Sequence, residues 1–256
     1  MTRRQLQIAL GFLWLLDGAL QAQPFMFTRD FATQVIAPLG HGQPAFVSAP
    51  VDWVSTVIAA HPVAWNLPFA LVQLLLGAGL LAPRTARPAL AASIAWALGV
   101  WYLGEGLGGL AGGGASLTAG APGPALLLAI LAAAAWPDRD ASRESPAPWL
   151  PFAWASVWVG GAVFEAMPHH GSAALAVAEY LVGVGALGRR TRVPAAAFGL
   201  ALSLSLWVLS QDLGSLTSGQ ATDPNTGPVL AVLAIALLGD RQLQPVERPR
   251  VLTSPA

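Results

Sequence analysis

The sequence predicts an all-α, polytopic membrane protein with eight transmembrane helices arranged as two parallel four-helix repeats. Three observations lead to this fold class: an apolar composition, an internal repeat and the positions of the arginines. The chain has 256 residues, of which 55% are hydrophobic and 10% are charged, and its mean hydropathy is +0.58. A soluble domain carries about 25% charged residues. So few charges cannot cover a globule in water, but they suit a surface solvated by lipid.

The second observation is a repeat within the chain. Residues 71–115 align without a gap on residues 177–221, and about 18 of roughly 45 positions are identical, far above chance. The identities include Gly77/Gly183, Gly79/Gly185, Arg84/Arg190, Thr85/Thr191, Pro88/Pro194, Trp101/Trp207, Leu107/Leu213 and Gly108/Gly214. At a different offset, Trp14, Gln21 and Pro24 match Trp158, Glu165 and Pro168. We therefore expect one repeat over residues 1–140, a second over 149–240, and a tail over 241–256.

The first repeat divides into four apolar runs. Spans are predicted over residues 6–24, 67–81, 89–103 and 124–136. A long connection, residues 25–66, follows the first span, and its apolar spacing predicts short surface helices over 30–39 and 51–60. Pro88 suits the first turn of the third span. A Gly-rich loop, residues 104–123, precedes the fourth span.

The second repeat follows a charged, Pro-containing linker, residues 138–148. Its predicted spans are residues 149–166, 172–187, 194–209 and 228–238. Some runs are nearer 15 than 20 residues, which is short for a crossing of about 30 Å, so flanking residues are expected to extend them. Each repeat has an even number of spans, so the repeats point the same way and their symmetry axis runs along the membrane normal.

The third observation is the placement of the 13 basic residues, all of them arginine. If the N-terminus is inside, the outer segments hold Arg29 alone. The inner segments hold Arg3, Arg4, Arg84, Arg87, Arg139, Arg143, Arg189, Arg190, Arg192, Arg241, Arg248 and Arg250. This positive-inside asymmetry predicts a multi-pass protein of the plasma membrane with both termini in the cytoplasm. The lipid bilayer is its first partner, and a net charge of zero removes any case for nucleic-acid binding.

Polar side chains inside or at the ends of the spans are the candidate ligand or proton sites, because lipid makes each of them costly unless it faces a partner or a cavity. These candidates are Asp17, Gln21, Gln73, Glu105, Glu165, Glu179, Gln211 and Asp212. Asp17 and Gln21 are four residues apart and share one helix face. Apart from Asp17, the acids fall in the outer half of the membrane, where they could line a polar cavity. The alternative is that they cap helix ends and hydrogen-bond across the bundle.

No catalytic or metal motif accompanies these residues. Without Cys, thiolate chemistry is excluded. Histidine, methionine and carboxylates on the outer side could together bind copper. The residues that would do so are Met26, His61, Met167, His169 and His170. Their spacing matches no metal signature, so we predict no metal site. Catalytic residues stay unassigned, because there is no nucleophile elbow, phosphate-binding loop or His-Glu-x-x-His helix.

One stretch resembles a known family. Residues 179–196 read EYLVGVGALGRRTRVPAA, with a Glu, two spaced glycines and a Thr-Arg turn before an Ala-rich span. In these features the chain resembles the DoxX-like membrane proteins, and the first copy carries Gln73 in place of Glu179. The resemblance implies a four-helix unit, here fused in tandem. It also implies association with a redox enzyme or a small lipophilic carrier such as a quinone.

Three functions remain open at this point. The first is a DoxX-like, redox-associated membrane subunit in which Trp14, Gln73, Glu179 and Tyr180 line a quinone pocket. The second is a small-molecule or proton-coupled transporter, with a path between the repeats and Asp17 and Glu179 as ion sites. The third is a membrane scaffold without chemistry of its own.

Overall fold

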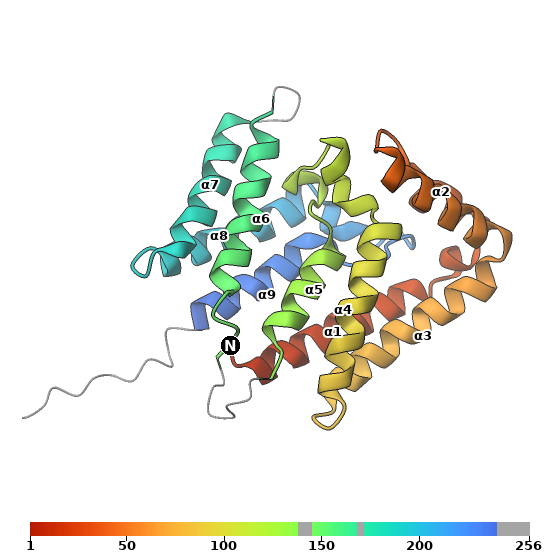
Figure 1. Cartoon of the computed structure of the whole chain (residues 1–256), viewed down its shortest axis with the longest axis horizontal. Coiled ribbons are helices and arrows are strands. Elements are labelled where there is room, and N and C mark those ends of the chain that lie inside the picture. Colours follow the sequence, from red (N-terminus) through yellow and green to blue (C-terminus); the bar gives the residue numbers. More distant parts are fainter. Residues whose placement is uncertain (138–144, 168–171, 240–256) are drawn as a thin grey trace, which may run out of the picture.

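The computed structural model describes residues 1–137, 145–167 and 172–239, and over these ranges all regular structure is helical (Figure 1). The first half contains α1 (Arg3–Gln21), α3 (Pro62–Leu81), α4 (Ala86–Leu103) and α5 (Pro124–Ala134). The second half contains α6 (Leu150–Glu165), α7 (Ala173–Leu187), α8 (Arg192–Leu209) and α9 (Thr226–Gly239). The all-α prediction is confirmed, and a helix lies at each of the eight predicted runs. The predicted tail, residues 241–256, and the linker arginines Arg139 and Arg143 lie outside the described residues.

The long connection between α1 and α3 differs from its predicted form. It contains η1 (Pro24–Phe27), η2 (Phe31–Ile36), η3 (Ala37–Gly40) and α2 (Ala45–Ala60). The helix expected over 30–39 is a π-turn followed by a 3-10 turn, because Pro38 interrupts the α-helical hydrogen bonds. The helix expected from residue 51 begins at Ala45 and runs through Pro50. Pro50 cannot donate to the Phe46 carbonyl, which instead accepts a hydrogen bond from the Tyr102 hydroxyl at 2.6 Å.

The helices pair in the same way in both halves. α1 packs along α3 and α6 along α7, while α4 packs on α5 and α8 on α9. Close approach of α1 and α3 depends on glycine, since a Cβ at Gly77 would lie 2.7 Å from the Gly11 carbonyl oxygen. A Cβ at Gly183, the equivalent position on α7, would lie 3.1 Å from the Ala155 carbonyl oxygen of α6. Small residues at these crossings let the helix backbones pack closely, as in membrane bundles.

Several residues shared by the two sequence copies make the same contacts in both halves. The Trp101 indole donates to the Pro122 carbonyl at 2.7 Å, and the Trp207 indole donates to the Pro224 carbonyl at 2.8 Å. Likewise, the Thr85 hydroxyl donates to Gly79 and the Thr191 hydroxyl to Gly185, both at 2.7 Å. The shared side chains therefore fix the turns at the two ends of α4 and α8.

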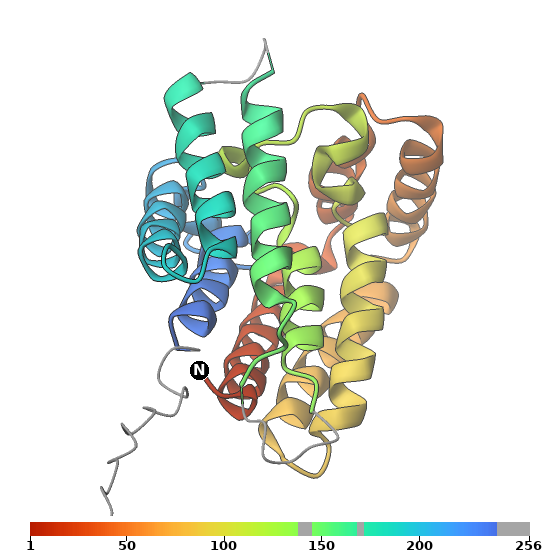
Figure 2. The ribbon, with the colours of Figure 1, turned by 60° about the vertical axis from the view of Figure 1, so that its left-hand side comes forward.

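One hydrophobic core joins the two halves, and α5 and α9 lie inside it. Buried residues of these two helices include Leu127, Leu131, Val229 and Leu233. The same cluster contains Trp14 of α1 and the α6 tryptophans. Helices that are apolar all round belong in such an interior. Figure 2 shows the N-terminus at one end of the bundle and α2 with the Gly-rich connection at the other.

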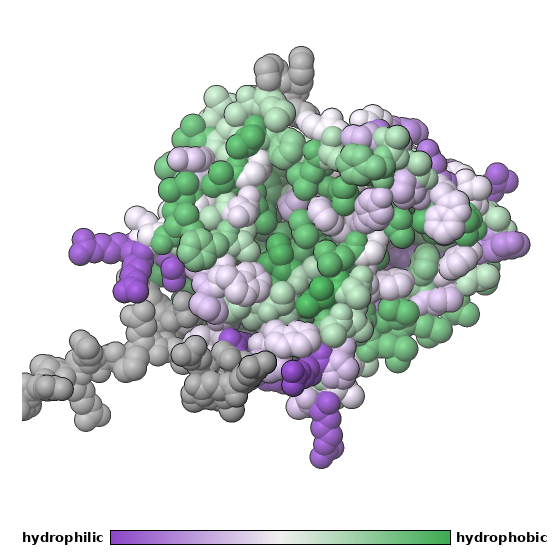
Figure 3. All heavy atoms as spheres, in the orientation of Figure 1, coloured by the Kyte–Doolittle hydropathy of each residue, from purple (hydrophilic) through white to green (hydrophobic). Residues whose placement is uncertain are grey.

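By length and composition, two of the described helices can cross a membrane, namely α3 and α8. A third candidate arises if α4 and η4 (Gly106–Gly112), bent by 51° at their junction, form one span. The other apolar helices are shorter. Large apolar side chains nevertheless point outward on several helices, for example Phe12 (60% exposed), Leu75 (70%), Phe152 (65%) and Leu209 (82%). Figure 3 shows hydrophobic side chains spread over much of one face.

Candidate functional site

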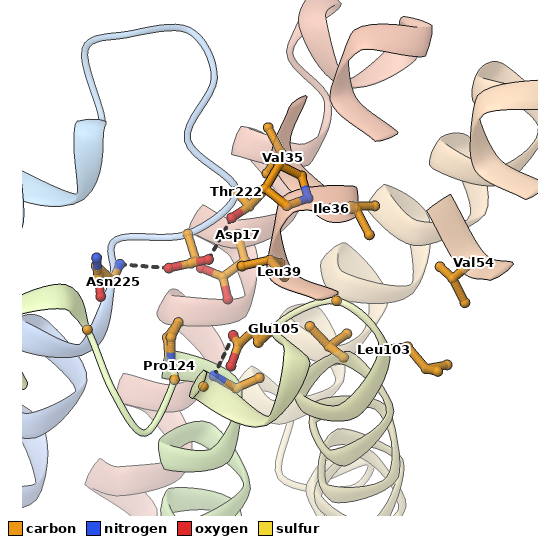
Figure 4. Close-up of a pocket in the computed structure, with 18 of the residues that line it drawn as sticks. Asp17, Val35, Ile36, Leu39, Val54, Leu103, Glu105, Pro124, Thr222 and Asn225 are labelled. Atoms are coloured by element: carbon orange, nitrogen blue, oxygen red, sulfur yellow. Dashed lines mark hydrogen bonds between the residues drawn. The ribbon is translucent and has the colours of Figure 1, made fainter. Parts of the chain in front are cut away.

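A cavity of about 990 Å³ lies at the end of the bundle where α2 sits. Its walls come from α1, α2, α3 and α4, from η2 and η3, and from the connections that precede α5 and α9 (Figure 4). Six aromatic side chains line it, namely Trp14, Phe31, Trp53, Trp65, Phe69 and Trp96. A volume near the top of the usual 300–1,000 Å³ range for ligand pockets can hold a drug-sized molecule.

Three carboxylates face this cavity from three separate parts of the chain (Figure 4). Asp17 comes from the middle of α1 and is 3% exposed. Glu105 follows the end of α4, and Asp223 precedes α9. The negative charges of Asp223 and Glu105 repel that of Asp17. None of the described residues lining the cavity is Arg or Lys, and His41 is the basic side chain among them.

Glu105 is held by the start of α5. Its Oε1 accepts a hydrogen bond from the Ala125 N–H at 3.0 Å, while its Oε2 is buried without a partner in the described structure. A carboxylate also suits the positive end of a helix dipole. Gln211 is the matching residue of the second half. Its Oε1 accepts from the Gly227 N–H at 3.2 Å at the start of α9. Both side chains therefore anchor the last helix of their half, but only Glu105 can carry charge.

Asp223 was not among the residues predicted from sequence. Its carboxylate accepts hydrogen bonds from the Asn225 N–H and the Thr222 hydroxyl, both at 2.7 Å. An Asp that bonds the backbone two residues on forms an Asx-turn, and this turn directs the acid toward the cavity. The Asp-Pro-Asn sequence at 223–225 signals such a turn but does not reveal what the loop faces.

Burial raises the pKa of both loop acids, Glu105 and Asp223. Burial, followed by repulsion from the Asp223 carboxylate, raises the pKa of Glu105 well above its ordinary value, and the Ala125 hydrogen bond partly offsets this. Burial also raises the pKa of Asp223, against the lowering effect of its two hydrogen bonds. Both residues lie in connections outside the α-helices. Burial therefore favours the protonated form of both loop acids.

Among the buried side-chain atoms of the lining residues, unused hydrogen-bond acceptors outnumber unused donors. Four lining oxygens are buried without a partner in the described structure: Asp17 Oδ1, Gln43 Oε1, Gln73 Oε1 and Glu105 Oε2. One lining donor, the Trp96 indole N–H, is also unused. The two carboxylate oxygens are the stronger evidence, because each can only accept when ionised. An amide rotated by 180° would place its NH2 group, a donor, where its oxygen lies. An acceptor-rich cavity fits a ligand that donates hydrogen bonds.

The remaining predicted residues fall in three places. Gln21 also lines the cavity, where its amide donates to the Asn66 carbonyl oxygen and the Asn66 amide donates to the Gln21 backbone carbonyl at 2.8 Å. Glu165 and Glu179 are buried in the second half and do not line the cavity. Asp212 is exposed and also lies outside the cavity wall. The structure thus separates Asp17 from Glu179, and Tyr180 is 51% exposed on α7.

The residues considered for copper do not come together. Met26 is fully buried in a hydrophobic cluster with Phe31, Val47 and Val51. His61 is exposed, Met167 is 38% exposed, and His169 and His170 lie outside the described residues. Over the described ranges, no group of three His, Asp or Glu side chains has metal-binding geometry. No protein-family model matches the chain, and no similar curated protein or solved structure was found.

Proposed function

We propose that this chain is an integral protein of the plasma membrane, with eight spans as two parallel repeats and both termini in the cytoplasm. The exposed apolar side chains of α1, α3, α6 and α8 support a lipid-facing surface. The N-terminus, the α3–α4 turn and the α7–α8 turn lie along the lower-left margin of Figure 1, and α2 lies at the opposite margin. Arg84 and Arg190 belong to those turns, in keeping with the positive-inside rule.

The proposed function is transport of a small organic cation that carries apolar groups. One observation carries this proposal: the carboxylates of Asp17, Glu105 and Asp223 line one cavity, which also contains six Trp and Phe side chains and has no Arg or Lys in its described lining. A cation with N–H groups would satisfy the unused acceptor oxygens, and the aromatic rings would stabilise its charge through their π faces. The cavity is bounded by the first half and by the loop before α9, so both repeats contribute to the proposed path.

A second candidate, favoured by a different observation, is a redox-associated subunit that handles a quinol. The resemblance to DoxX-like proteins suggests this class. The unused Trp96 indole N–H could donate to a carbonyl oxygen, and the free oxygens of Asp17 and Gln73 could accept from hydroxyl groups. The residues present therefore fit a quinone or quinol head group. When bound, such a carrier would supply electron transfer, while these side chains would orient it and exchange protons.

Two lipophilic ions of similar shape and opposite sign separate the candidates. Tetraphenylphosphonium has no N–H group, so it tests the charge and aromatic contacts alone. It should bind the detergent-purified protein saturably and quench its tryptophan fluorescence, whereas tetraphenylborate should not. Asp17→Asn should weaken cation binding about tenfold, close to 1.4 kcal/mol. Asp212→Asn is the matched control and should leave it unchanged. Equal binding of both ions would refute cation selectivity. Binding of decylubiquinol alone would favour the redox subunit, and binding of none of these probes would favour the scaffold.

A further inference from the structure

The second half contains a pair of buried carboxylates behind the cavity wall. Glu179 of α7 is fully buried, and neither of its carboxylate oxygens has a hydrogen-bond partner in the described structure. A Cβ built at Gly161 of α6 would lie 3.2 Å from Glu179 Oε2. The carboxylate therefore rests against α6 at Gly161. Glu165 lies four residues further along α6, on the same helix face, and it is 4% exposed.

One hydroxyl connects this pair to the cavity. The Ser116 hydroxyl donates to Glu165 Oε2 at 2.9 Å, and Ser116 also lines the cavity. The Ser116 and Thr118 hydroxyl oxygens are 2.6 Å apart, and Ser116 Oγ accepts from the Thr118 N–H at 3.1 Å. These bonds fix the serine between Glu165 and the cavity. A hydroxyl held in this way can accept a proton on one side while giving up its own on the other.

The matching positions of the first half have a different chemistry. Gln21 and Gln73 occupy the places of Glu165 and Glu179, and an amide cannot exchange a proton in this way. By the same alignment, Asp17 corresponds to Gly161 in the second half. The bare α6 surface at Gly161 is what leaves room for the Glu179 carboxylate. In the first half the acid lies on α1, and in the second it lies on α7.

The surroundings of Glu179 offer few other charged groups. Within the described residues, the charged group that repels the Glu179 carboxylate is Glu165. α8, the other helix packed against α7, has Arg192 at its first residue as its only ionisable side chain. A carboxylate buried without a partner is more stable as the neutral acid.

We propose that Glu179 is a proton site that exchanges with the cavity through Glu165 and Ser116. Glu179 gives its proton to Glu165 and becomes a carboxylate. Glu165 then protonates Ser116 Oγ while the Ser116 hydroxyl, turned from Glu165 toward the cavity, releases its own proton to water, so that Glu165 and Ser116 return to their starting protonation. If a monovalent cation enters as this proton leaves, the total charge is conserved. This coupling rests on the proposed transport function, which it would make proton-coupled, but the proton site itself can be tested without any cation.

Infrared spectroscopy of the purified protein provides that test. The wild type should show carboxylic-acid C=O intensity with a component from Glu179, and that component should be lost in Glu179→Gln, which should still fold because the first half carries Gln73 at this place. On transfer to D₂O, this component should shift about tenfold more slowly in Ser116→Ala, and Ser116→Thr should restore the rate. Absence of this component, or exchange unaffected by Ser116→Ala, would overturn the proton site whether or not a cation binds.

A second measurement links the site to transport. Titrating tetraphenylphosphonium into weakly buffered wild-type protein should release protons as the cation binds. In Glu179→Gln the cation should still bind, because Glu179 does not line the cavity, but proton release should fall at least severalfold. Unchanged release in Glu179→Gln would refute the coupling. Loss of cation binding in the wild type would instead refute the proposed transport function and leave the infrared result to decide the proton site.

Discussion

Replacing Glu105 with glutamine should stabilise the protein at neutral and alkaline pH. Glutamine keeps the Oε1 acceptor that receives the Ala125 N–H at 3.0 Å. It removes the charge on an oxygen that is buried without a partner. In the second half, the Gln211 amide oxygen accepts from the Gly227 N–H at 3.2 Å in the same way, so an amide can make this contact. The Gln211 NH2 group also donates to the Leu117 carbonyl and the Thr226 hydroxyl, both at 2.9 Å, whereas Glu105 Oε2 has no partner in the described structure. The substitution therefore changes charge while leaving the anchor of α5 in place.

The pH dependence follows from the direction of the pKa shift. Burial and the Asp223 carboxylate raise the pKa of Glu105 above its unfolded value. The stability contributed by protonated Glu105 is present below the ordinary carboxyl pKa and is lost as pH rises through the raised value. At about pH 8 the variant should gain about 1–3 kcal/mol, the cost of an unsatisfied buried group. This corresponds to roughly 2–4 °C in Tm per kcal/mol for a chain of this size. Near pH 4 the gain should shrink toward zero.

Thermal unfolding in detergent, followed by tryptophan fluorescence at both pH values, measures this difference. Glu105→Ala is the control, since it removes the charge and also leaves the Ala125 N–H without its acceptor. It should cost about 1–3 kcal/mol near pH 4, where the charge no longer matters. If Glu105→Gln destabilised the protein equally at both pH values, the carboxylate would have a role in the fold that its neutral form cannot fill, and the argument from desolvation would be wrong.

Two further predictions concern the membrane and the helix packing. Reporter fusions after Arg87, Arg143 and Arg192 should report the cytoplasm, and fusions near Gln43 and Asn225 the outside; a cytoplasmic signal near Gln43 would end the eight-span proposal. Gly77→Ala should cost about 1–3 kcal/mol in thermal unfolding, as overpacking does, because its Cβ would lie 2.6 Å from Leu15 Cγ. Gly99→Ala, with open space around its Cβ, is the matched control and should be neutral; equal losses would exclude packing as the cause.

Sequence reasoning located the helices because their signals are local. Pro24 follows the end of α1, Pro62 begins α3, and Gly188 ends α7, so most predicted boundaries agree with the structure within a few residues. The predicted start of α3 at residue 67 is wrong, because the helix begins at Pro62 and continues through Pro68. Helix length is the weaker part of the prediction, since α5 and α9 are shorter than a full crossing.

The cavity could be predicted only in part, because it depends on contacts between distant segments. Asp17 lies deep in an apolar run, which predicts that its side chain faces the interior, and the side chain is buried in the structure. Asn66 and Ser116 gave no comparable signal, since each acquires its role from a partner far along the chain. Asp223 sits in a loop that reads only as a turn. Hydrophobic periodicity describes which face of a helix is buried, but not which loop closes over it.

The differences between the repeats are more informative about function than their identities. Identical positions such as Trp101 and Trp207 make the same backbone contact, so they explain the fold. At the position of Glu105 and Gln211, an oxygen must accept the first N–H groups of a helix, and either side chain can do this. The structural requirement is thus met without charge, and a carboxylate there costs stability. A carboxylate at position 105, where an amide oxygen can meet the same structural requirement, therefore supports the proposed binding of a cation or exchange of a proton.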